Sequence, residues 1–250
     1  MIALVDADSL LYRVGFAIED KVIWNEMEFL AGQDKEAEVE YYTNLPLVIK
    51  TFDQQIDNIL FATECKDAVL VLSGASNFRM ELPTEYKANR ESARKPLAYD
   101  ELRKHLIENY SHYEANGMEA DDYVVFLKTK YPEDYILCAI DKDVLYQTEG
   151  THYNYFNDSE ITVTKEEAIK FAYFQTLTGD TTDGYIGCPS IGKVKAEKLL
   201  AEAETEKEMW DIVVQAYESK GLSEEEAVWT MRLANMHQFD GNKIQLWNPP

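Results

Sequence analysis

Short apolar runs alternate with amphipathic stretches along the first half of the chain. Residues 2–5, 68–72 and 135–140 are apolar runs of the length expected for buried strands. Between the first two, residues 47–62 carry apolar side chains at helical spacing. Strands that alternate with helices predict a mostly parallel sheet covered on both faces, so the expected fold class is α/β.

Weaker patterns complete the expected order of elements. A Thr164-x-x-Glu167 capping box precedes the expected helix 168–177. Residues 152–156 are expected to form an edge strand, and the acidic residues 20–39 an insertion without clear pattern. Further helices are expected to begin at Ser9 and to cover residues 99–110, 119–131, 191–203, 205–219 and 223–237.

Composition narrows the class of protein. The chain has 250 residues, 46% hydrophobic and 28% charged, which fits one globular domain with a small subdomain. It has no apolar run of about 18 residues, so no membrane span is expected. The three cysteines are scattered without CxxC spacing, which favours a reducing, cytoplasmic setting without a zinc site.

The charge is large and unevenly distributed. The formal net charge of −22 argues against nucleic acid as a partner, but net charge does not describe a single groove. Residues 79–104 hold seven bases against five acids, and residues 193–198 hold three lysines against one acid. These two basic segments are either contacts for a polyanion or solvated faces of mixed charge.

Carboxylates gather where strands end and helices begin. Two such charges about 4 Å apart repel by roughly 4 kcal/mol at an effective dielectric near 20, so a bound cation is expected to neutralise them. Oxygen-only ligands select hard ions such as Mg²⁺ or Mn²⁺. The groups are Asp6-x-Asp8, Glu119-x-Asp121-Asp122, Asp141-x-Asp143 and Asp180-x-x-Asp183. Together they indicate a metal-dependent enzyme that acts on phosphates.

Each group also has a simpler explanation. Asp8 either shares a strand face with Asp6 or caps the following helix. Glu119 and Asp122 are i,i+3 neighbours whose charges suit a helix N-terminus. Asp180 lies in a glycine-rich segment, where an aspartate commonly forms a turn.

A second motif lies in the segment 183–196. Its glycines at 187 and 192 bracket a tight turn that opens a helix, where backbone amides can meet a phosphate and lysines add charge. Such a turn would hold a duplex backbone without recognising bases. The alternative is a helix–turn–helix of purely structural purpose.

Five ordered motifs resemble the flap endonuclease and 5′→3′ exonuclease superfamily, and most of all the stand-alone exonucleases of tailed bacteriophages. They span residues 5–196, and the tail 246–249 also resembles the end of the phage enzymes. The motifs are Val5-Asp6-Ala7-Asp8, Asn77-Phe78-Arg79 with Tyr86-Lys87-Ala88-Asn89-Arg90, Met118-Glu119-Ala120-Asp121-Asp122, Asp141-Lys142-Asp143, and Phe174-Gln175-Thr176 with Gly179-Asp180-Thr181-Thr182-Asp183-Gly184-Tyr185.

The resemblance implies a three-layer α/β/α PIN-like core with a mostly parallel sheet, a helical arch and a C-terminal helix–three-turn–helix region. Residues 1–160 would form the nuclease core, with the arch over about 74–112, and residues 161–250 a helical region packed on it as one compact unit. The acids that match the family's ligands for two divalent metals are Asp6, Glu119, Asp121, Asp122, Asp141, Asp143, Asp180 and Asp183, with Asp8 as an additional candidate.

The resemblance also implies roles for other residues. Lys87 and Arg90 match residues that contact the scissile phosphate, and they are the expected catalytic residues. The loop that matches 187–193 binds duplex backbone in the family, with K⁺ as a candidate ion. The expected DNA-binding residues are Arg79, Tyr86, Arg94, Lys95, Gly187, Ser190, Gly192, Lys193 and Lys195.

One departure from the family pattern lies at the end of the second strand. The family usually has an aspartate there, whereas this chain has Ser73-Gly74. One metal would lose a protein ligand and gain a water, unless Asp8 compensates. The arch segment is also short, which leaves open whether a free 5′ end threads through it.

The function expected is that of a Mg²⁺-dependent 5′→3′ exonuclease with flap endonuclease activity, in phage-type replication or recombination. Its substrate would be duplex DNA with 5′ ends, nicks or flaps, with RNA–DNA hybrids as a further candidate and Mn²⁺ as a substitute ion. The expected state is a monomer in the cytoplasm, of the host if phage-encoded. Two alternatives stay open: a PIN-type ribonuclease, and a non-catalytic protein that binds branched DNA.

Overall fold

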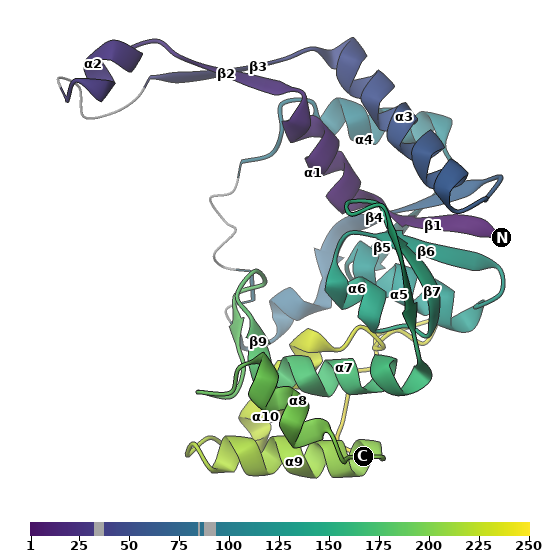
Figure 1. The fold of residues 1–250 in the computed structure, drawn as a ribbon, viewed down its shortest axis with the longest axis vertical. Helices are drawn as coiled ribbons and strands as arrows, with labels where there is room; N and C mark the ends of the chain where they lie inside the picture. Colours follow the sequence, from purple (N-terminus) through teal and green to yellow (C-terminus); the bar gives the residue numbers. More distant parts are fainter. Residues whose placement is uncertain (33–37, 85, 88–93) are drawn as a thin grey trace.

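A mostly parallel sheet lies between two layers of helices, with a further group of helices below it (Figure 1). The computed structural model describes residues 1–32, 38–84, 86–87 and 94–250. The sheet has the strand order β5-β4-β1-β6-β7-β8. Its strands are β1 (Ile2–Asp6), β4 (Ala68–Asn77), β5 (His112–Gly117), β6 (Tyr135–Ala139), β7 (Gly150–Asn154) and β8 (Ser159–Val163). The expected α/β architecture is confirmed.

The N-terminal strand lies at the centre of the sheet. Val5 of β1 pairs in parallel with Leu70 of β4 on one side and with Cys138 of β6 on the other. The β4–β5 and β6–β7 pairs are also parallel, whereas β7–β8 is antiparallel. The parallel strands therefore end at one edge of the sheet, where such folds place their ligands.

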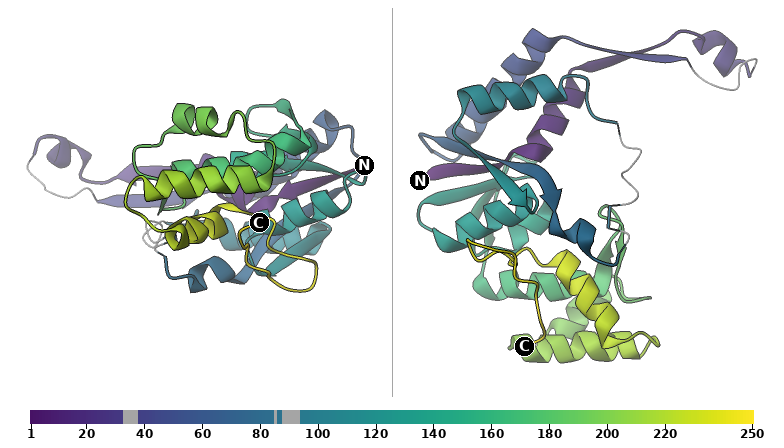
Figure 2. Two further views of the ribbon diagram at one scale, coloured as in Figure 1. Left: turned by 90° about the horizontal axis from the view of Figure 1, so that it is seen from below. Right: turned by 180° about the vertical axis from the view of Figure 1, so that it is seen from behind.

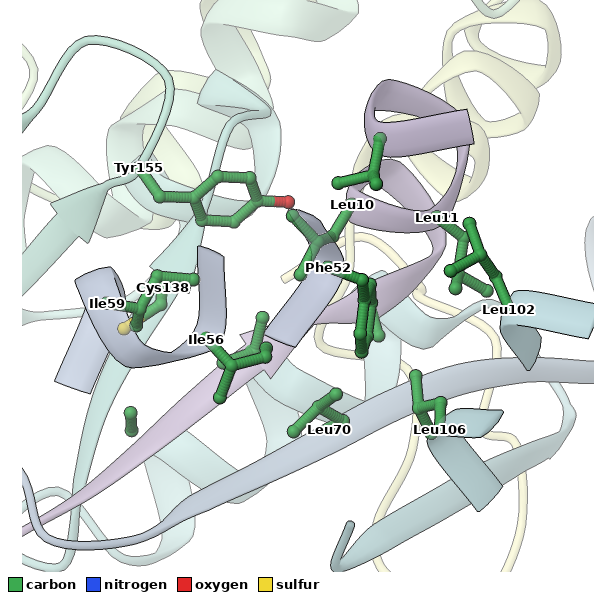
Figure 3. Close-up of a cluster of buried hydrophobic side chains, with 14 of the residues drawn as sticks. Leu10, Leu11, Phe52, Ile56, Ile59, Leu70, Leu102, Leu106, Cys138 and Tyr155 are labelled. Atoms are coloured by element: carbon green, nitrogen blue, oxygen red, sulfur yellow. The ribbon is translucent and has the colours of Figure 1, made fainter. Parts of the chain in front are cut away.

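Alternate residues of the strands face opposite helical layers. Val5 and Leu70 pack on one side in a cluster that includes the fully buried Phe52, shown in Figure 3. Leu4 and Val71 pack on the other side. The helices of the first side are α1 (Ala7–Ala17), α3 (Leu45–Ala62) and α4 (Tyr99–Asn109), and those of the second are α5 (Ala120–Lys130) and α6 (Lys142–Tyr146). Burial on both faces explains why these strands are apolar runs without polar alternation.

The C-terminal helices form a second hydrophobic cluster around Tyr173, Trp210 and Tyr217. The expected capping box is present, because the Thr164 side chain and Glu167 bond each other's backbone amides at the start of α7. A short antiparallel ribbon of two strands, each two residues long, then separates α7 from α8. The elements are α7 (Lys165–Thr178), β9 (Gly179–Asp180), β10 (Tyr185–Ile186), α8 (Lys193–Leu200), α9 (Glu206–Glu218) and α10 (Glu224–Ala234).

Polar side chains join the helical region to the core. Buried Gln147 donates to the carbonyl of Ala234 and accepts from the amide of Met236. Beyond α10 the chain returns to the core, where Phe239 and Leu246 pack against Phe78. The core sheet extends to the end of β8, so the helical region begins at α7 and slightly later than expected.

Two sequence-based expectations differ from the structure. Residues 152–156 are not an edge strand, because β7 is flanked by β6 and β8, and β8 forms the edge. The described part of the acidic insertion has regular structure: β2 (Glu19–Ile23) and β3 (Val39–Thr43) form an antiparallel ribbon that projects from the body, with α2 (Glu26–Leu30) between them in the sequence (Figures 1 and 2). Backbone pairing holds the ribbon together, so its side chains need no apolar periodicity.

The helical arch stays a prediction. Strand β4 runs on to Asn77 and is followed by the short helix η1 (Phe78–Glu81), and the next described helix is α4. Residues 85 and 88–93 of the expected arch segment lie outside the described residues. None of the described helices is both long and apolar enough to cross a membrane.

Candidate active site

Three helices begin shortly after a strand of the sheet ends, and the N-cap residue of each helix is an acid. Asp6 is the N-cap of α1, Glu119 of α5 and Asp141 of α6. Because β1 lies beside β6 and α5 packs against β1, the three junctions lie at the same edge of the sheet. The topology therefore brings together acids that are far apart in the sequence.

Asp6, Asp121 and Asp141 form what we call the inner carboxylates. Asp6 is 1% exposed, and neither of its carboxylate oxygens accepts a hydrogen bond from the described residues. Burial, and then the charges of Asp8 and Asp141, raise the pKa of Asp6 to about 7. Burial, with the charges of Asp6 and Asp141, also raises the pKa of Asp121 well above its ordinary value. No ion pair reaches the inner carboxylates from the described part of the chain.

The neighbouring acids are paired with lysines, and we call Asp143, Asp180, Glu119 and Asp183 the lysine-bridged carboxylates. Lys142 Nζ lies 2.8 Å from Asp180 Oδ2 and 3.1 Å from Asp143 Oδ1. Burial opposes the effect, but the Lys142 hydrogen bond lowers the pKa of Asp180. Burial and the charge of Asp141 raise the pKa of Asp143 to about 6, against the pull of Lys142.

Lys87 joins the other two lysine-bridged carboxylates. Its Nζ bonds Glu119 Oε1 and lies 3.7 Å from Asp183 Oδ1, and its backbone amide donates to the Asp183 carbonyl at 2.8 Å. Its φ of 54° lies in the left-handed region, which is rare for a residue with a side chain. Burial opposes the shift, but Glu119 and Asp183 raise the pKa of Lys87. The predicted catalytic lysine is therefore held among the acids.

Tyr86 is buried beneath this pair. Its hydroxyl donates to Glu119 Oε2 at 2.7 Å and lies 3.2 Å from Asp183 Oδ2, and the residue is 4% exposed. Binding of DNA by Tyr86 stays a prediction. A tyrosine in a basic segment resembles a surface contact in the sequence, whereas its hydroxyl here positions two carboxylates.

Arg79 is also buried, and binding of DNA by Arg79 stays a prediction. Its guanidinium donates to both oxygens of Asp122, at 2.6 and 2.8 Å, and to the carbonyls of Leu233 and Asn235. Asp122 also accepts from the Glu119 amide and completes a capping box of α5. Because Arg79 bonds both oxygens of Asp122, Asp122 differs from the other predicted metal ligands: its carboxylate is already occupied by a protein cation.

The Ser73-Gly74 departure has a structural explanation. Ser73 Oγ accepts from the amide of Ala120, and the Ser73 amide donates to Asp8 Oδ2, both at 2.9 Å. A Cβ at Gly74 would lie 2.5 Å from the carbonyl oxygen of Ala115, so a larger residue does not fit there without a shift. Asp8 thus links the first turn of α1 to the middle of β4. Asp8 neither shares a strand face with Asp6 nor caps the following helix, because β1 ends at Asp6 and Asp6 is the N-cap of α1.

The remaining basic candidates of the first segment lie away from the acids. Arg94 pairs with Glu19 and stacks 3.8 Å from the ring centroid of Tyr41, which fixes it to the base of the ribbon. Lys95 Nζ lies 4.4 Å from the ring centroid of Tyr99. Arg90, the second predicted catalytic residue, lies outside the described residues.

The loop between β10 and α8 presents most of the second basic segment to solvent. Ser190 is exposed with φ 64°, Gly192 is the N-cap of α8, and Lys193 and Lys195 are exposed beyond it. Gly187 differs, because it is buried and a Cβ there would lie 2.3 Å from the amide nitrogen of Gly179. Its role is close packing of the β9–β10 ribbon.

Sequence reasoning missed two members of this site. Lys142 stands inside the Asp141-x-Asp143 motif, but its contact with Asp180 spans 38 positions. Ser73 was noted only as a missing acid, although serine is a common partner for a helix N-terminus. Within the described part of the chain, no three carboxylate, histidine or cysteine side chains are arranged tightly enough to hold a metal as they stand.

Comparison with known proteins places this arrangement in a family. Residues 1–174 match the family described as 5′-3′ exonuclease, N-terminal resolvase-like domain. An exodeoxyribonuclease of Enterobacteria phage T3 and an exonuclease of Escherichia phage T7 are each 26% identical over 229 aligned residues, with 72% of this chain and 73% of each relative covered.

A solved structure supports the fold over nearly the whole chain. The flap endonuclease of bacteriophage T5, in complex with DNA and metal ions, superposes with a TM-score of 0.64 at 14% identity, covering 94% of this chain and 89% of that one. At this identity the likeness shows the fold, which is the expected PIN-like α/β/α architecture. The resemblance inferred from the five ordered motifs is therefore confirmed, and the chain belongs to the 5′-3′ exonuclease family of nucleases.

Proposed function

We propose that the chain is a divalent-metal-dependent 5′→3′ exonuclease with structure-specific flap endonuclease activity on duplex DNA. Its relatives in phages T3 and T7 are named as exonucleases, and a relative from Shewanella woodyi, 30% identical over 140 residues, is named as a flap endonuclease. We propose Mg²⁺ as the natural ion and phage-type replication or recombination as the setting.

The observation that best supports this proposal is that no cation of the described residues pairs with the inner carboxylates. Asp6 has two buried oxygens without hydrogen-bond partners, and burial, followed by the charges of Asp8 and Asp141, raises its pKa. Hard divalent cations prefer such oxygen ligands, so these residues fit a metal. We propose that Asp6, Asp121 and Asp141 hold one ion and that Asp143, Asp180 and Asp183 hold a second. Bound ions in such sites lower the pKa of water and stabilise a leaving oxygen.

The chain's own cations would act on the phosphate. Lys87 is held at Glu119 and Asp183, beside the inner carboxylates, where its charge offsets the negative charge that develops on a reacting phosphate. The exposed residues Ser190, Gly192, Lys193 and Lys195 would hold the duplex backbone through amides and charge, without recognising bases. This division of labour reconciles a net charge of −22 with a polyanionic substrate.

The decisive experiment removes two carboxylates. The variant Asp141→Ala/Asp143→Ala is compared with wild type on 5′-labelled nicked, 5′-flap and blunt duplexes, with Mg²⁺ or with EDTA. We expect Mg²⁺-dependent products from wild type and none from the variant. The matched control is Glu202→Ala/Glu204→Ala, which removes two exposed acids at the same spacing from the α8–α9 connection. Products from the Asp141→Ala/Asp143→Ala variant at the wild-type rate would refute the proposal.

The same assay separates the alternatives. Matched RNA and RNA–DNA substrates distinguish a DNA nuclease from a PIN-type ribonuclease, and we expect cleavage of DNA and of RNA in hybrids. Tight, salt-dependent binding of branched DNA without any Mg²⁺-dependent product would indicate a non-catalytic binding protein.

A further inference from the structure

Lys142 contacts two of the proposed metal ligands, Asp143 and Asp180, although it has no role in the proposed reaction. Its Nζ lies 2.8 Å from Asp180 Oδ2 and 3.1 Å from Asp143 Oδ1. The other oxygen of Asp180 accepts from the amides of Thr182 and Asp183, at 2.7 and 3.3 Å. Asp180 is therefore fully satisfied by groups of the protein itself.

The inner carboxylates offer a direct contrast. Asp6 and Asp143 both have a buried oxygen without a hydrogen-bond partner, but Asp143 has an ammonium group at contact distance, which it shares with Asp180. An ammonium and a divalent cation cannot occupy the same space between two carboxylates, and like charges at such distances repel. A metal that binds Asp143 and Asp180 therefore has to displace Lys142.

Lys142 is placed so that it can leave. Its side chain is 50% exposed, and it lies in the first turn of the short helix α6. Arg79, which bonds both oxygens of Asp122, is 2% exposed and also donates to two carbonyls. A half-exposed lysine on a flexible stem exchanges its partners for water at low cost, whereas a buried guanidinium does not.

We propose that Lys142 is a positioning residue that acts as an exchangeable internal cation. It holds Asp143 and Asp180 in place in the metal-free protein and competes with the second divalent ion, so it weakens and tunes metal binding in that half of the site. This inference rests on the proposed function, because it takes Asp143 and Asp180 as metal ligands.

The test measures metal binding without substrate. Mg²⁺ is titrated into wild type, Lys142→Met, Lys142→Arg and Lys207→Met, and binding is followed by calorimetry and by the thermal unfolding midpoint. Lys207→Met is the matched control, because it removes a lysine that pairs with Asp211 at 3.0 Å on exposed α9. Circular dichroism verifies that each variant is folded.

We expect Lys142→Met to have a lower unfolding midpoint without metal, because Asp143 and Asp180 then repel each other without compensation. Its affinity for Mg²⁺ should rise by up to about fivefold, the scale of a lost ion pair of this exposure. Arginine keeps the charge and bonds carboxylates more firmly, so Lys142→Arg should bind Mg²⁺ more weakly than wild type. This second variant keeps the order of affinities testable if Lys142→Met does not fold.

Three results would overturn the inference. The first is equal or weaker Mg²⁺ binding by Lys142→Met, and the second is tighter binding by Lys207→Met to the same degree. The third is weaker DNA binding in EDTA by Lys142→Met with unchanged Mg²⁺ affinity, which would make Lys142 a phosphate contact. If wild type neither binds Mg²⁺ nor cleaves DNA, the proposed function itself fails, so the two failures are distinguishable.

Discussion

The two halves of the acid cluster solve the same electrostatic problem in different ways. The inner carboxylates have no cation of the described residues bonded to them; Asp6 is buried with both oxygens unpaired, Asp121 is partly buried and Asp141 is exposed. The lysine-bridged carboxylates are each in contact with Lys87 or Lys142. One half thus has no bonded cation among the described residues, and the other half is in contact with two lysines. The difference teaches that a count of acids does not describe a metal site, because the distribution of cations decides which acids are available.

The largest effect is expected from Asp6→Asn, which removes one inner carboxylate. Cleavage of a 5′-labelled nicked duplex should fall on the order of 10³-fold, the scale for losing a group that stabilises charge at the reacting centre. The metal-free protein should become more stable, because a buried charge is removed. Urea unfolding in EDTA measures the second effect.

The same substitution on the lysine-bridged side is the control. Asp180→Asn leaves Lys142 with one acid fewer, so the metal-free protein should become less stable. Opposite signs for Asp6→Asn and Asp180→Asn sharpen the comparison, and equal signs would contradict it.

The next largest effect is expected from Arg79→Met, which leaves Asp122 buried without its partner. The free energy of unfolding should fall by about 3–5 kcal/mol, as for other broken buried ion pairs. The loss should be the same with and without Mg²⁺, because Arg79 is not exchangeable. Arg79→Met/Asp122→Asn should recover part of the stability, and urea unfolding of both variants measures this. A loss that Mg²⁺ reverses would show that Arg79 belongs with the exchangeable cations.

A smaller effect separates Asp6 from Glu119 and Asp180 by pH, whereas Asp143, whose pKa is raised to about 6, behaves like Asp6. The raised pKa of Asp6, about 7 against 3.8, stabilises the metal-free fold below pH 4, and this stabilisation is lost as pH rises to 7. Its size is at most about 4 kcal/mol, from the linkage of pKa to stability. The lowered pKa values of Glu119 and Asp180 act in the opposite direction, since their stabilisation is lost only as pH falls below about 4. Thermal unfolding in EDTA between pH 4 and 8 should therefore show a declining midpoint in wild type and a flatter one in Asp6→Asn.

Local patterns predicted much of the fold. The runs at 2–5, 68–72 and 135–140 are strands because both their faces are buried, and the Thr164 capping box begins a helix as expected. The ribbon β2–β3 was not predicted, because backbone pairing stabilises it without an apolar period in its sequence. The edge strand β8 was not predicted either, because its apolar alternation is limited to Ile161 and Val163.

Among the candidate site residues, the acids were easier to identify from the sequence than the surroundings of Arg79 and Tyr86. Acids at strand ends were identified because strand limits are visible in the sequence. Arg79 and Tyr86 were taken as DNA contacts because they stand in a basic segment, and sequence does not reveal that both side chains are buried.

The sequence by itself determined the alternation of strands and helices, the acids at their junctions and the family to which the chain belongs. These features are local, since they depend on residues within a few positions of one another. Only the tertiary structure decided which acids are neutralised. Arg79 and Asp122 are 43 positions apart, and Tyr86 and Asp183 are 97 apart, so topology alone brings them into contact. A carboxylate's charge is written in the sequence, but its pKa and its freedom to bind a metal depend on burial and on partners supplied by distant segments.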